Sequence, residues 1–216
     1  MKILLSVVLL MVVLVGCQEQ PQQTKIAFGS CGYQDEPQPV LGIAAEQKPD
    51  AFIFLGDNIY GDTDDMRILK SKYEQLQNKP TFQNLKKNVP LIATWDDHDF
   101  GRNDAGRHYP FKKESKEIFL DFFNEPADSP RRQREGIYTA YMHEINGKKV
   151  QIILLDNRTF RDDIPAFKKG VIEDKRYFYE LDYLPHNTKD ATFLGEAQWN
   201  WLEKELAKPA DIRLIG

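Results

Sequence analysis

The sequence predicts an α/β fold, in which short buried strands alternate with amphipathic helices. Several apolar runs that are too short for helices stop at polar clusters, as the run 51–55 does at Asp57 and the run 90–95 does at Asp96. This is the pattern of buried strands that carry polar side chains at their C-terminal ends. Segments with helical spacing lie between these runs, and a strand, a helix and a strand in succession usually give parallel strands with a right-handed crossover.

The chain has 216 residues, enough to bury a core, and its composition is that of a globular protein. Lys and Arg total 29 against 33 Asp and Glu, which gives a formal net charge of -4, and no basic run is longer than a few residues. This balance argues against a nucleic-acid-binding surface. We expect one globular unit over residues 25–216 that works as a monomer.

The first residues have the features of an export signal. Lys2 precedes the apolar run 3–15, which is too short to span a bilayer comfortably. The sequence LVGC that ends at Cys17 resembles the lipobox of bacterial lipoproteins, in which the cysteine is lipidated; an ordinary signal peptide cut one residue earlier is the alternative. We expect a lipoprotein signal peptide at 1–16 and a flexible tether at 17–24. The lipid would anchor the protein in the bacterial cell envelope, either periplasmic or associated with the outer membrane.

In the first half of the chain, helical segments are recognised by apolar residues that share one face. Met66, Leu69 and Tyr73 recur at helical spacing after Asp64 and Asp65, whose charges suit the first turn of a helix. The expected elements are a strand at 25–30, a helix at 38–47, a strand at 51–55, a helix that starts at 64–65 and ends by residue 80, a helix at 81–87 and a strand at 90–95.

The second half contains a hairpin signal and most of the irregular segments. Asn146-Gly147 separates an alternating segment from a continuously apolar one, which predicts a hairpin whose second strand lies at the centre of a sheet. Trp199, Leu202 and Leu206 are expected to face inward from the last helix. The expected elements are a loop at 96–110, a helix at 111–123, an exposed arginine-rich loop at 128–135, strands at 137–145 and 150–155, an irregular segment at 159–193, a helix at 195–206 and a strand at 211–215.

Polar side chains follow several of the predicted strands and should meet at one edge of the fold. These strand ends carry Cys31, then Asp57 with Tyr60, then Asp96, Asp97 and His98, then Asp156 with Arg158. The C-terminal ends of strands in an α/β sheet are where such folds bind their ligands. A carboxylate with a phenolate suits a trivalent ion such as iron, and further carboxylates suit calcium, magnesium or manganese. The pattern therefore predicts a metal site.

Each of these side chains also has a purely structural interpretation. A Gly-Asp pair after a strand, as at Asp57, is commonly a plain turn, and Asp96 could cap a turn or support a ligand. With Cys17 lipidated, Cys31 has no partner for a disulfide. We interpret Cys31 as a thiolate ligand, and an inert buried cysteine is the alternative. His98 could likewise be a packed loop histidine.

The segments that carry these residues resemble the PhoD-like (alkaline phosphatase D) branch of the calcineurin-like metallophosphoesterases. In family order, the matching segments are FGSC at 28–31, LGDNIY at 55–60, WDDHD at 95–99 followed by ND at 103–104, LDNR at 155–158 and LGEAQW at 194–199. None is specific alone, but together they are. The resemblance implies a β-sandwich of two sheets flanked by helices, of which this sequence contains the N-terminal portion.

The resemblance also implies a set of metal ligands. Cys31 and Tyr60 would hold iron(III), and Asp57 would bridge it to a second metal, which is calcium by the resemblance, with other divalent metals as possible substitutes. Asp97 stands where the superfamily has an asparagine ligand, and Asp96 is a further candidate ligand.

Two residues are implied to act on a phosphate ester. His98 would touch the phosphate and could donate a proton to the leaving alkoxide. Arg158 would hold a phosphate oxygen, for which a guanidinium fork is well suited. The expected function is the hydrolysis of phosphate mono- or diesters by metal-activated water in an exported, lipid-anchored enzyme.

The sequence departs from the family towards its C-terminal end. The family completes its metal site with histidines nearer the C-terminus, and no such pair occurs before Gly216. We therefore expect a truncated chain that shows little turnover alone. The alternatives are an envelope lipoprotein that keeps the scaffold as a binding module, an inactive fragment, or a hydrolase of another ester. His108, His143 and His186 receive no role.

Overall fold

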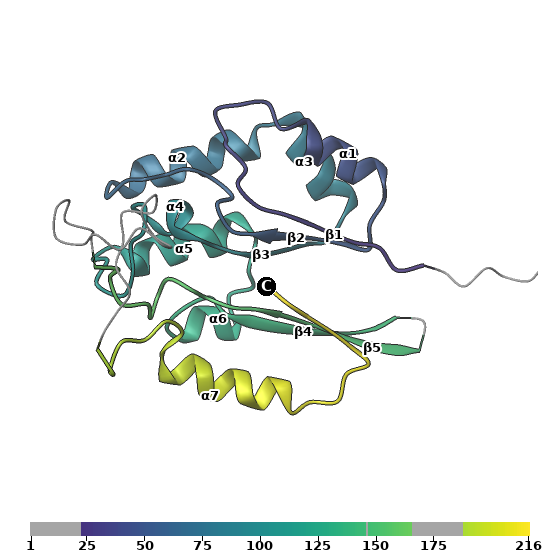
Figure 1. Ribbon diagram of the computed structural model, residues 1–216. Coiled ribbons are helices and arrows are strands. Elements are labelled where there is room, and N and C mark those ends of the chain that lie inside the picture. Colours follow the sequence, from purple (N-terminus) through teal and green to yellow (C-terminus); the bar gives the residue numbers. More distant parts are fainter. Residues whose placement is uncertain (1–22, 146, 166–187) are drawn as a thin grey trace, which may run out of the picture.

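The computed structural model describes residues 23–145, 147–165 and 188–216, and these form a mixed α/β fold with two three-stranded sheets (Figure 1). The strands of the first sheet are all parallel and lie side by side in chain order. They are β1 (Ile26–Gly29), β2 (Ala51–Leu55) and β3 (Leu91–Thr94). The predicted α/β class and the parallel strand pairing are confirmed.

The second sheet contains the predicted hairpin. β5 (Lys148–Leu154) lies between β4 (Thr139–Ile145) and β6 (Ile212–Ile215), antiparallel to the first and parallel to the second. The hairpin pairs Ile145 with Lys148. The buried strand after the hairpin is therefore central in its sheet, as its continuous apolar run predicted.

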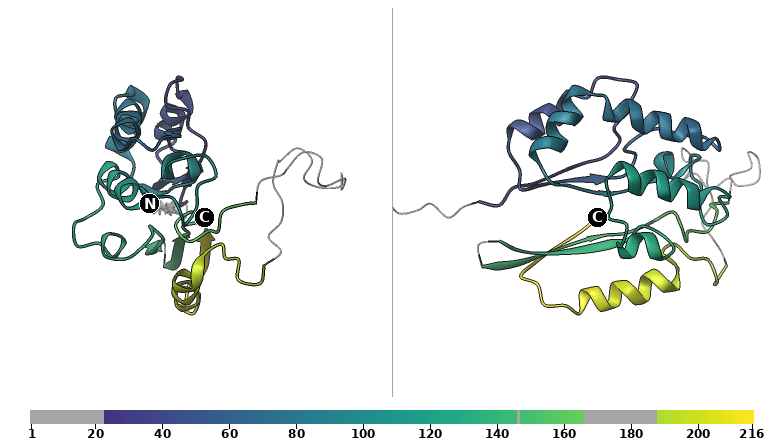
Figure 2. Two further views of the ribbon diagram at one scale, coloured as in Figure 1. Left: turned by 90° about the vertical axis from the view of Figure 1, so that its left-hand side faces the viewer. Right: turned by 180° about the vertical axis from the view of Figure 1, so that it is seen from behind.

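The helices cover the outer faces of the two sheets. Within the described residues they are α1 (Pro39–Glu46), α2 (Met66–Gln77), α3 (Pro80–Asn88), α4 (Asp97–Phe100), α5 (Lys112–Phe122), α6 (Pro130–Gln133) and α7 (Gly195–Leu206). Figure 1 shows α1, α2 and α3 on one side of the first sheet and α7 beyond the second, and the view from behind in Figure 2 shows the same layers. None of the helices in the described part of the chain is long and apolar enough to cross a bilayer.

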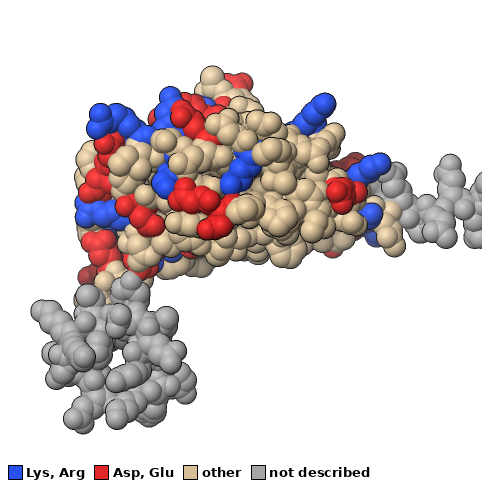
Figure 3. All heavy atoms as spheres, turned by 90° about the horizontal axis from the view of Figure 1, so that it is seen from above, with Lys and Arg blue, Asp and Glu red and all other residues tan. Residues whose placement is uncertain are grey.

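Three apolar clusters hold these layers together. The largest packs one face of the first sheet against α1, α2, α3 and α5, and includes Phe54, Leu69 and Phe119. A second lies between the two sheets, where Ile53 meets Ile152. A third packs the second sheet against α7. The result is a sandwich of two sheets with helices outside. On the face over α1, α2 and α3, charged side chains of both signs are intermixed (Figure 3).

Residues predicted as loops contain two short helices. Residues 96–110 were expected to be irregular, but α4 occupies their start. Asp99 caps this helix, because its Oδ1 accepts from the Asp96 amide at 2.7 Å. The stretch 128–135 was expected to be exposed, and this is wrong for Arg131, which is 2% exposed. Arg131 donates to the carbonyls of Ala93 and Ile137 at 2.9 and 2.7 Å, so it satisfies backbone acceptors between the two sheets.

The face that the last helix buries was only partly predicted: Leu202 faces inward as expected, but Trp199 and Leu206 do not. Trp199 is 55% exposed and Leu206 is 40% exposed, while Gln198 is fully buried beside Leu202. Gln198 accepts from the Asp156 amide at 2.8 Å and donates to its carbonyl at 2.7 Å. The helix faces this way because the backbone at the end of β5 needs hydrogen-bond partners.

The start of α2 differs slightly from the prediction. Asp65 caps α2 rather than lying in its first turn, because its carboxylate accepts from the Arg67 amide at 2.9 Å.

The predicted signal peptide at 1–16 and the lipidation site Cys17 lie outside the described residues.

Candidate metal centre

The ends of β1 and β2 bring Cys31 next to Asp57. The Cys31 amide donates to the Gly56 carbonyl at 3.2 Å, and Cys31 Sγ lies 3.6 Å from Asp57 Oδ2. Both residues have left-handed backbone conformations, with φ of 60° at Cys31 and 50° at Asp57. Non-glycine residues adopt this conformation at a cost, which is a feature of functional turns. The proximity of these two side chains is what the strand pattern predicted.

Gly56 allows the ends of β2 and β3 to approach each other closely. Its φ is 108°, and a Cβ atom there would lie 2.7 Å from the Cβ of Asp96. A side chain would therefore push apart the two segments that carry Asp57 and Asp97. Glycine at this position is a condition for the site.

Asp57, Asp97 and His98 form a cluster in which one potential ligand atom of each lies within 4.8 Å of the others. Burial raises the pKa of Asp57, and the carboxylates of Asp97 and Asp96 raise it further. Asp57 Oδ1 is buried and has no hydrogen-bond partner among the described residues. A buried carboxylate oxygen without a donor, surrounded by other carboxylates, fits a bound cation, because a cation offsets both the desolvation and the repulsion.

Tyr60 adds a phenol to the same cluster. Burial raises the pKa of Tyr60, and its hydrogen bonds with Cys31 and Asp57 raise it further. Its amide donates to Gln34 Oε1 at 2.7 Å, and its ring centroid lies 4.2 Å from that of His98. A thiol, a carboxylate and a phenol thus meet at one point, and this donor set fits a metal ion.

His98 lies in α4 and is held by a carboxylate that the sequence did not single out. Its Nδ1 is 2.7 Å from Asp62 Oδ1. Burial alone would lower the pKa of His98, but the hydrogen bond with Asp62 and the charges of Asp97, Asp62 and Asp57 outweigh it and raise the pKa. Because Nδ1 is engaged, Nε2 is the ring nitrogen left for another partner.

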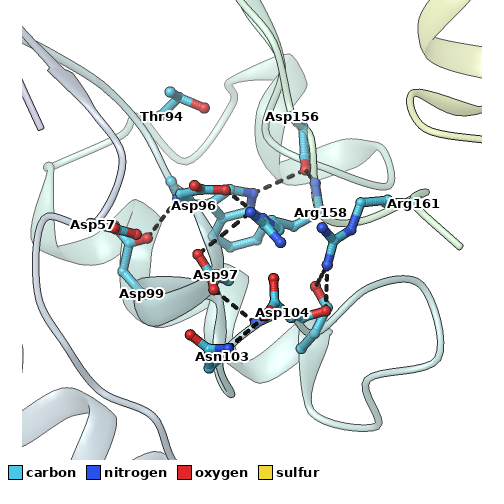
Figure 4. Close-up of polar contacts among 12 residues, drawn as sticks. Asp57, Thr94, Asp96, Asp97, Asp99, Asn103, Asp104, Asp156, Arg158 and Arg161 are labelled. Atoms are coloured by element: carbon cyan, nitrogen blue, oxygen red, sulfur yellow. Dashed lines mark hydrogen bonds and ion pairs between the residues drawn. The ribbon is translucent and has the colours of Figure 1, made fainter. Parts of the chain in front are cut away.

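Arg158 lies on the other side of the acidic cluster from Asp57 (Figure 4). Its Nε donates to Asp96 Oδ1, and its Nη2 is 3.4 Å from Asp97 Oδ1. Its Nη1 is buried and has no hydrogen-bond partner within the described residues. Asp96 therefore pairs with Arg158 and lies outside the cluster of Asp57, Asp97 and His98.

Two buried acids, Asp99 and Asp156, hold the turns next to the site. Asp99 accepts from the amides of Asn58 and Asp96 at 3.1 and 2.7 Å, which joins the ends of β2 and β3, and burial raises its pKa well above the usual value. Asp156 accepts from Trp95 Nε1 at 3.0 Å and from the Arg158 amide at 3.0 Å. These contacts hold the turns that carry the cluster and Arg158.

Sequence reasoning missed Asp62 and Arg161. Asp62 ends the same run as Asp57, and its acidity was the available signal. Arg161 follows Arg158 in the turn after β5 and is 5% exposed, next to the cluster (Figure 4). Burial lowers the pKa of Arg161, and the nearby charge of Arg158 lowers it further.

The other histidines lie apart from this cluster or outside the described residues. His108 Nδ1 is 2.8 Å from Asp163 Oδ2, and the His143 ring lies beside Tyr141 on β4. Cys17 and His186 fall in parts of the chain that the structure does not describe. No role follows for these three histidines.

Comparison with known proteins finds a matching family model and a similar solved structure. Residues 68–212 match the sequence model described as "PhoD-like phosphatase". A solved chain titled "Structure of PhoD" superposes with a TM-score of 0.68 at 17% identity, covering 89% of this chain and 41% of that chain. This chain thus spans less than half the length of that solved chain, and at this identity the likeness shows the fold. Among curated protein sequences, no significant match was found.

Proposed function

Because the chain belongs to the PhoD-like phosphatase family, as its motifs predicted, we propose that it is a metal-dependent hydrolase of phosphate mono- or diesters. One observation carries the proposal: the buried Oδ1 of Asp57, which has no hydrogen-bond partner among the described residues, lies in a cluster with Asp97 and His98. Arg158, one of whose buried donors has no partner in the described part of the chain, lies on the far side of Asp97. Acidic ligands beside a guanidinium suit a phosphate group bound to metal.

The proposed metal-holding residues are Cys31, Asp57, Tyr60 and Asp97. Iron(III) would take the thiolate and the phenolate, and calcium or another divalent ion would take the carboxylates, with Asp57 shared between the two. When bound, the metal ions would act as Lewis acids that activate water and neutralise charge on the phosphoryl oxygens. A ligand role for Asp96 stays a prediction, since its carboxylate is paired with Arg158.

Arg158 and His98 are proposed to act on the ester. The pair with Asp96 fixes the guanidinium plane. The Nη1 of Arg158, which no described residue engages, would donate to a phosphate oxygen. Asp62 holds Nδ1 of His98 and helps to keep the ring protonated, so Nε2 would donate its proton to the leaving oxygen. The raised pKa of His98 keeps the ring protonated, and so able to donate, to a higher pH.

We further propose that the enzyme is exported and anchored by lipid on Cys17, and that it acts as a monomer. The lipobox-like segment before Cys17 supports the anchor. This arrangement would place the domain at 25–216 in the cell envelope, where a tether at 17–24 gives it reach.

Metal analysis of the full chain tests the proposal. We expect bound iron and a visible tyrosinate-to-iron absorption that Tyr60→Phe abolishes. Tyr33→Phe is the matched control, because its ring packs edge-on against Tyr60 at 5.3 Å without belonging to the proposed ligands, and it should keep the absorption. Hydrolysis should be confined to phosphate esters when a phosphomonoester, a phosphodiester and a carboxylic ester are compared.

Colourless protein without bound metal would instead support the binding-module alternative. Hydrolysis of the carboxylic ester without hydrolysis of either phosphate ester would reject the substrate class while keeping an enzyme.

A further inference from the structure

We propose that Arg161 is a positioning residue that orients the Asp97 carboxylate through the backbone of Asp104. The inference rests on the proposed function, because it takes Asp97 as a metal ligand. Arg161 comes from the segment after β5, whereas Asp97 opens α4, so the two belong to different layers of the fold. The connection between them consists of two consecutive hydrogen bonds.

Arg161 and Asp97 hold opposite ends of the same residue (Figure 4). Arg161 Nη2 donates to the Asp104 carbonyl, and the Asp104 amide donates to Asp97 Oδ2 at 2.7 Å. Asp104 has a φ of 58°, a conformation that a non-glycine residue keeps only when its surroundings hold it. Without Arg161, the residue whose amide donates to Asp97 Oδ2 would lose the hydrogen bond that Arg161 donates to its carbonyl.

The backbone of Arg161 is locked onto the same loop. The Arg107 amide donates to the Arg161 carbonyl at 2.8 Å. A Cβ atom at Gly106 would lie 2.4 Å from that carbonyl oxygen, so the approach requires glycine. The loop 104–107 therefore meets Arg161 through both its side chain and its backbone, which leaves little freedom in the Asp104 peptide.

The hydrogen-bond partners of Arg161 separate this role from direct contact with substrate. Arg161 is 5% exposed, its Nε is buried without a partner among the described residues, and its Nη2 reaches the carbonyls of Asp104 and Ala105. A buried guanidinium is costly, and it is retained here where it can satisfy backbone acceptors behind a metal ligand. Arg158 is buried to a similar degree, at 7% exposed, but its guanidinium directly faces Asp96 and Asp97.

Binding of Mn2+ alone to the full chain, followed by electron paramagnetic resonance, tests the inference. Arg161→Met and Arg161→Gln should each weaken Mn2+ binding about 10-fold or more, the loss typical of removing a residue that supports a ligand. Hydrogen exchange of the Asp104 amide should accelerate in both variants. Arg107→Met is the matched control, because it removes a surface ion pair with Asp162 between the same two segments but keeps the backbone bond, and it should leave Mn2+ affinity unchanged.

The possible outcomes are distinct. If either Arg161 variant is folded, as judged by circular dichroism, and binds Mn2+ as the unaltered chain does, the inference is overturned; should the Met variant not fold, the Gln variant decides. Weaker binding of inorganic phosphate with unchanged Mn2+ affinity would make Arg161 a phosphate ligand and would also overturn it. An unaltered chain that binds no metal would reject the proposed function itself.

Discussion

At the scale of single residues, the protonation of His98 links the acidic cluster to pH. The folded pKa of His98 is raised above the usual value of about 6.5, so the protonated ring is favoured in the folded chain. The stability that its partners contribute is therefore fully present below about pH 6.5 and is lost as the pH rises through the raised pKa. Asp62, whose carboxylate touches Nδ1, is the partner that can be changed without altering a proposed metal ligand.

Asp62→Asn should lower the pKa of His98, because the amide removes the negative charge that faces Nδ1. The measurement is an NMR titration of the histidine ring protons in metal-free protein. Asp163→Asn is the control, since it alters an equivalent pair with His108 at 2.8 Å and should not move His98. A His98 titration that is identical with and without Asp62 would show that the other acids set its pKa.

The residues of the candidate site differ in how far sequence predicted them. Cys31 and Asp57 were predictable, because an apolar strand that ends in a turn places the next polar side chain at the sheet edge. The pairing of Arg158 with Asp96 was not, because these residues are 62 positions apart and their contact depends on how two sheets pack. The link from Arg161 to Asp97 runs through a backbone group, which leaves no signal in residue types.

At the scale of elements, strands were more predictable than short helices and helix faces. Every described strand was expected within a few residues of its bounds, because continuous or alternating apolar runs identify them. By contrast, α6 was predicted as an exposed loop, and the Gln198 side chain was not expected to face inward from α7. In both cases a polar side chain is buried to satisfy backbone groups, which hydrophobic periodicity does not predict.

The turn after β2 is the element on which the site most depends, and Gly56 tests it. Gly56→Ala combines a positive φ with a Cβ atom 2.7 Å from Asp96, so we expect a loss of about 3 kcal/mol in the free energy of unfolding. Urea denaturation measures it. The variant should also weaken metal binding, because the segments that carry Asp57 and Asp97 must move apart.

Gly147→Ala separates the cost of the positive φ from the cost of the close contact with Asp96. Gly147 has a φ of 72° but nothing within 4 Å of a Cβ atom, so alanine there should cost only about 1 kcal/mol of backbone strain. Equal losses at the two glycines would mean that the close approach of β2 and β3 contributes nothing.

At the scale of the whole molecule, the packing of two sheets places Arg158, the proposed phosphate-binding arginine, opposite the proposed metal ligands. Thr94 Oγ1 at the end of β3 donates to the Leu155 carbonyl at 2.7 Å, and Trp95 Nε1 donates to Asp156 Oδ1 at 3.0 Å. The C-terminal ends of strands from both sheets are thereby joined. Asp97 follows one of these ends and Arg158 follows the other, so their relative position depends on the core between the sheets.

Ile152→Ala tests the contribution of the apolar core between the two sheets. Ile152 is 1% exposed and belongs to the cluster between the sheets, so its truncation should lower the free energy of unfolding by about 3 kcal/mol, through lost burial and the cavity that remains. Trp199→Ala removes a larger side chain that is 55% exposed on α7, and it should cost less than about 1 kcal/mol. Urea denaturation of both variants gives the comparison. A greater loss at Trp199 than at Ile152 would mean that α7 packs through the face that hydrophobic periodicity predicted, and that the contact between the sheets is not what holds Arg158 opposite Asp97.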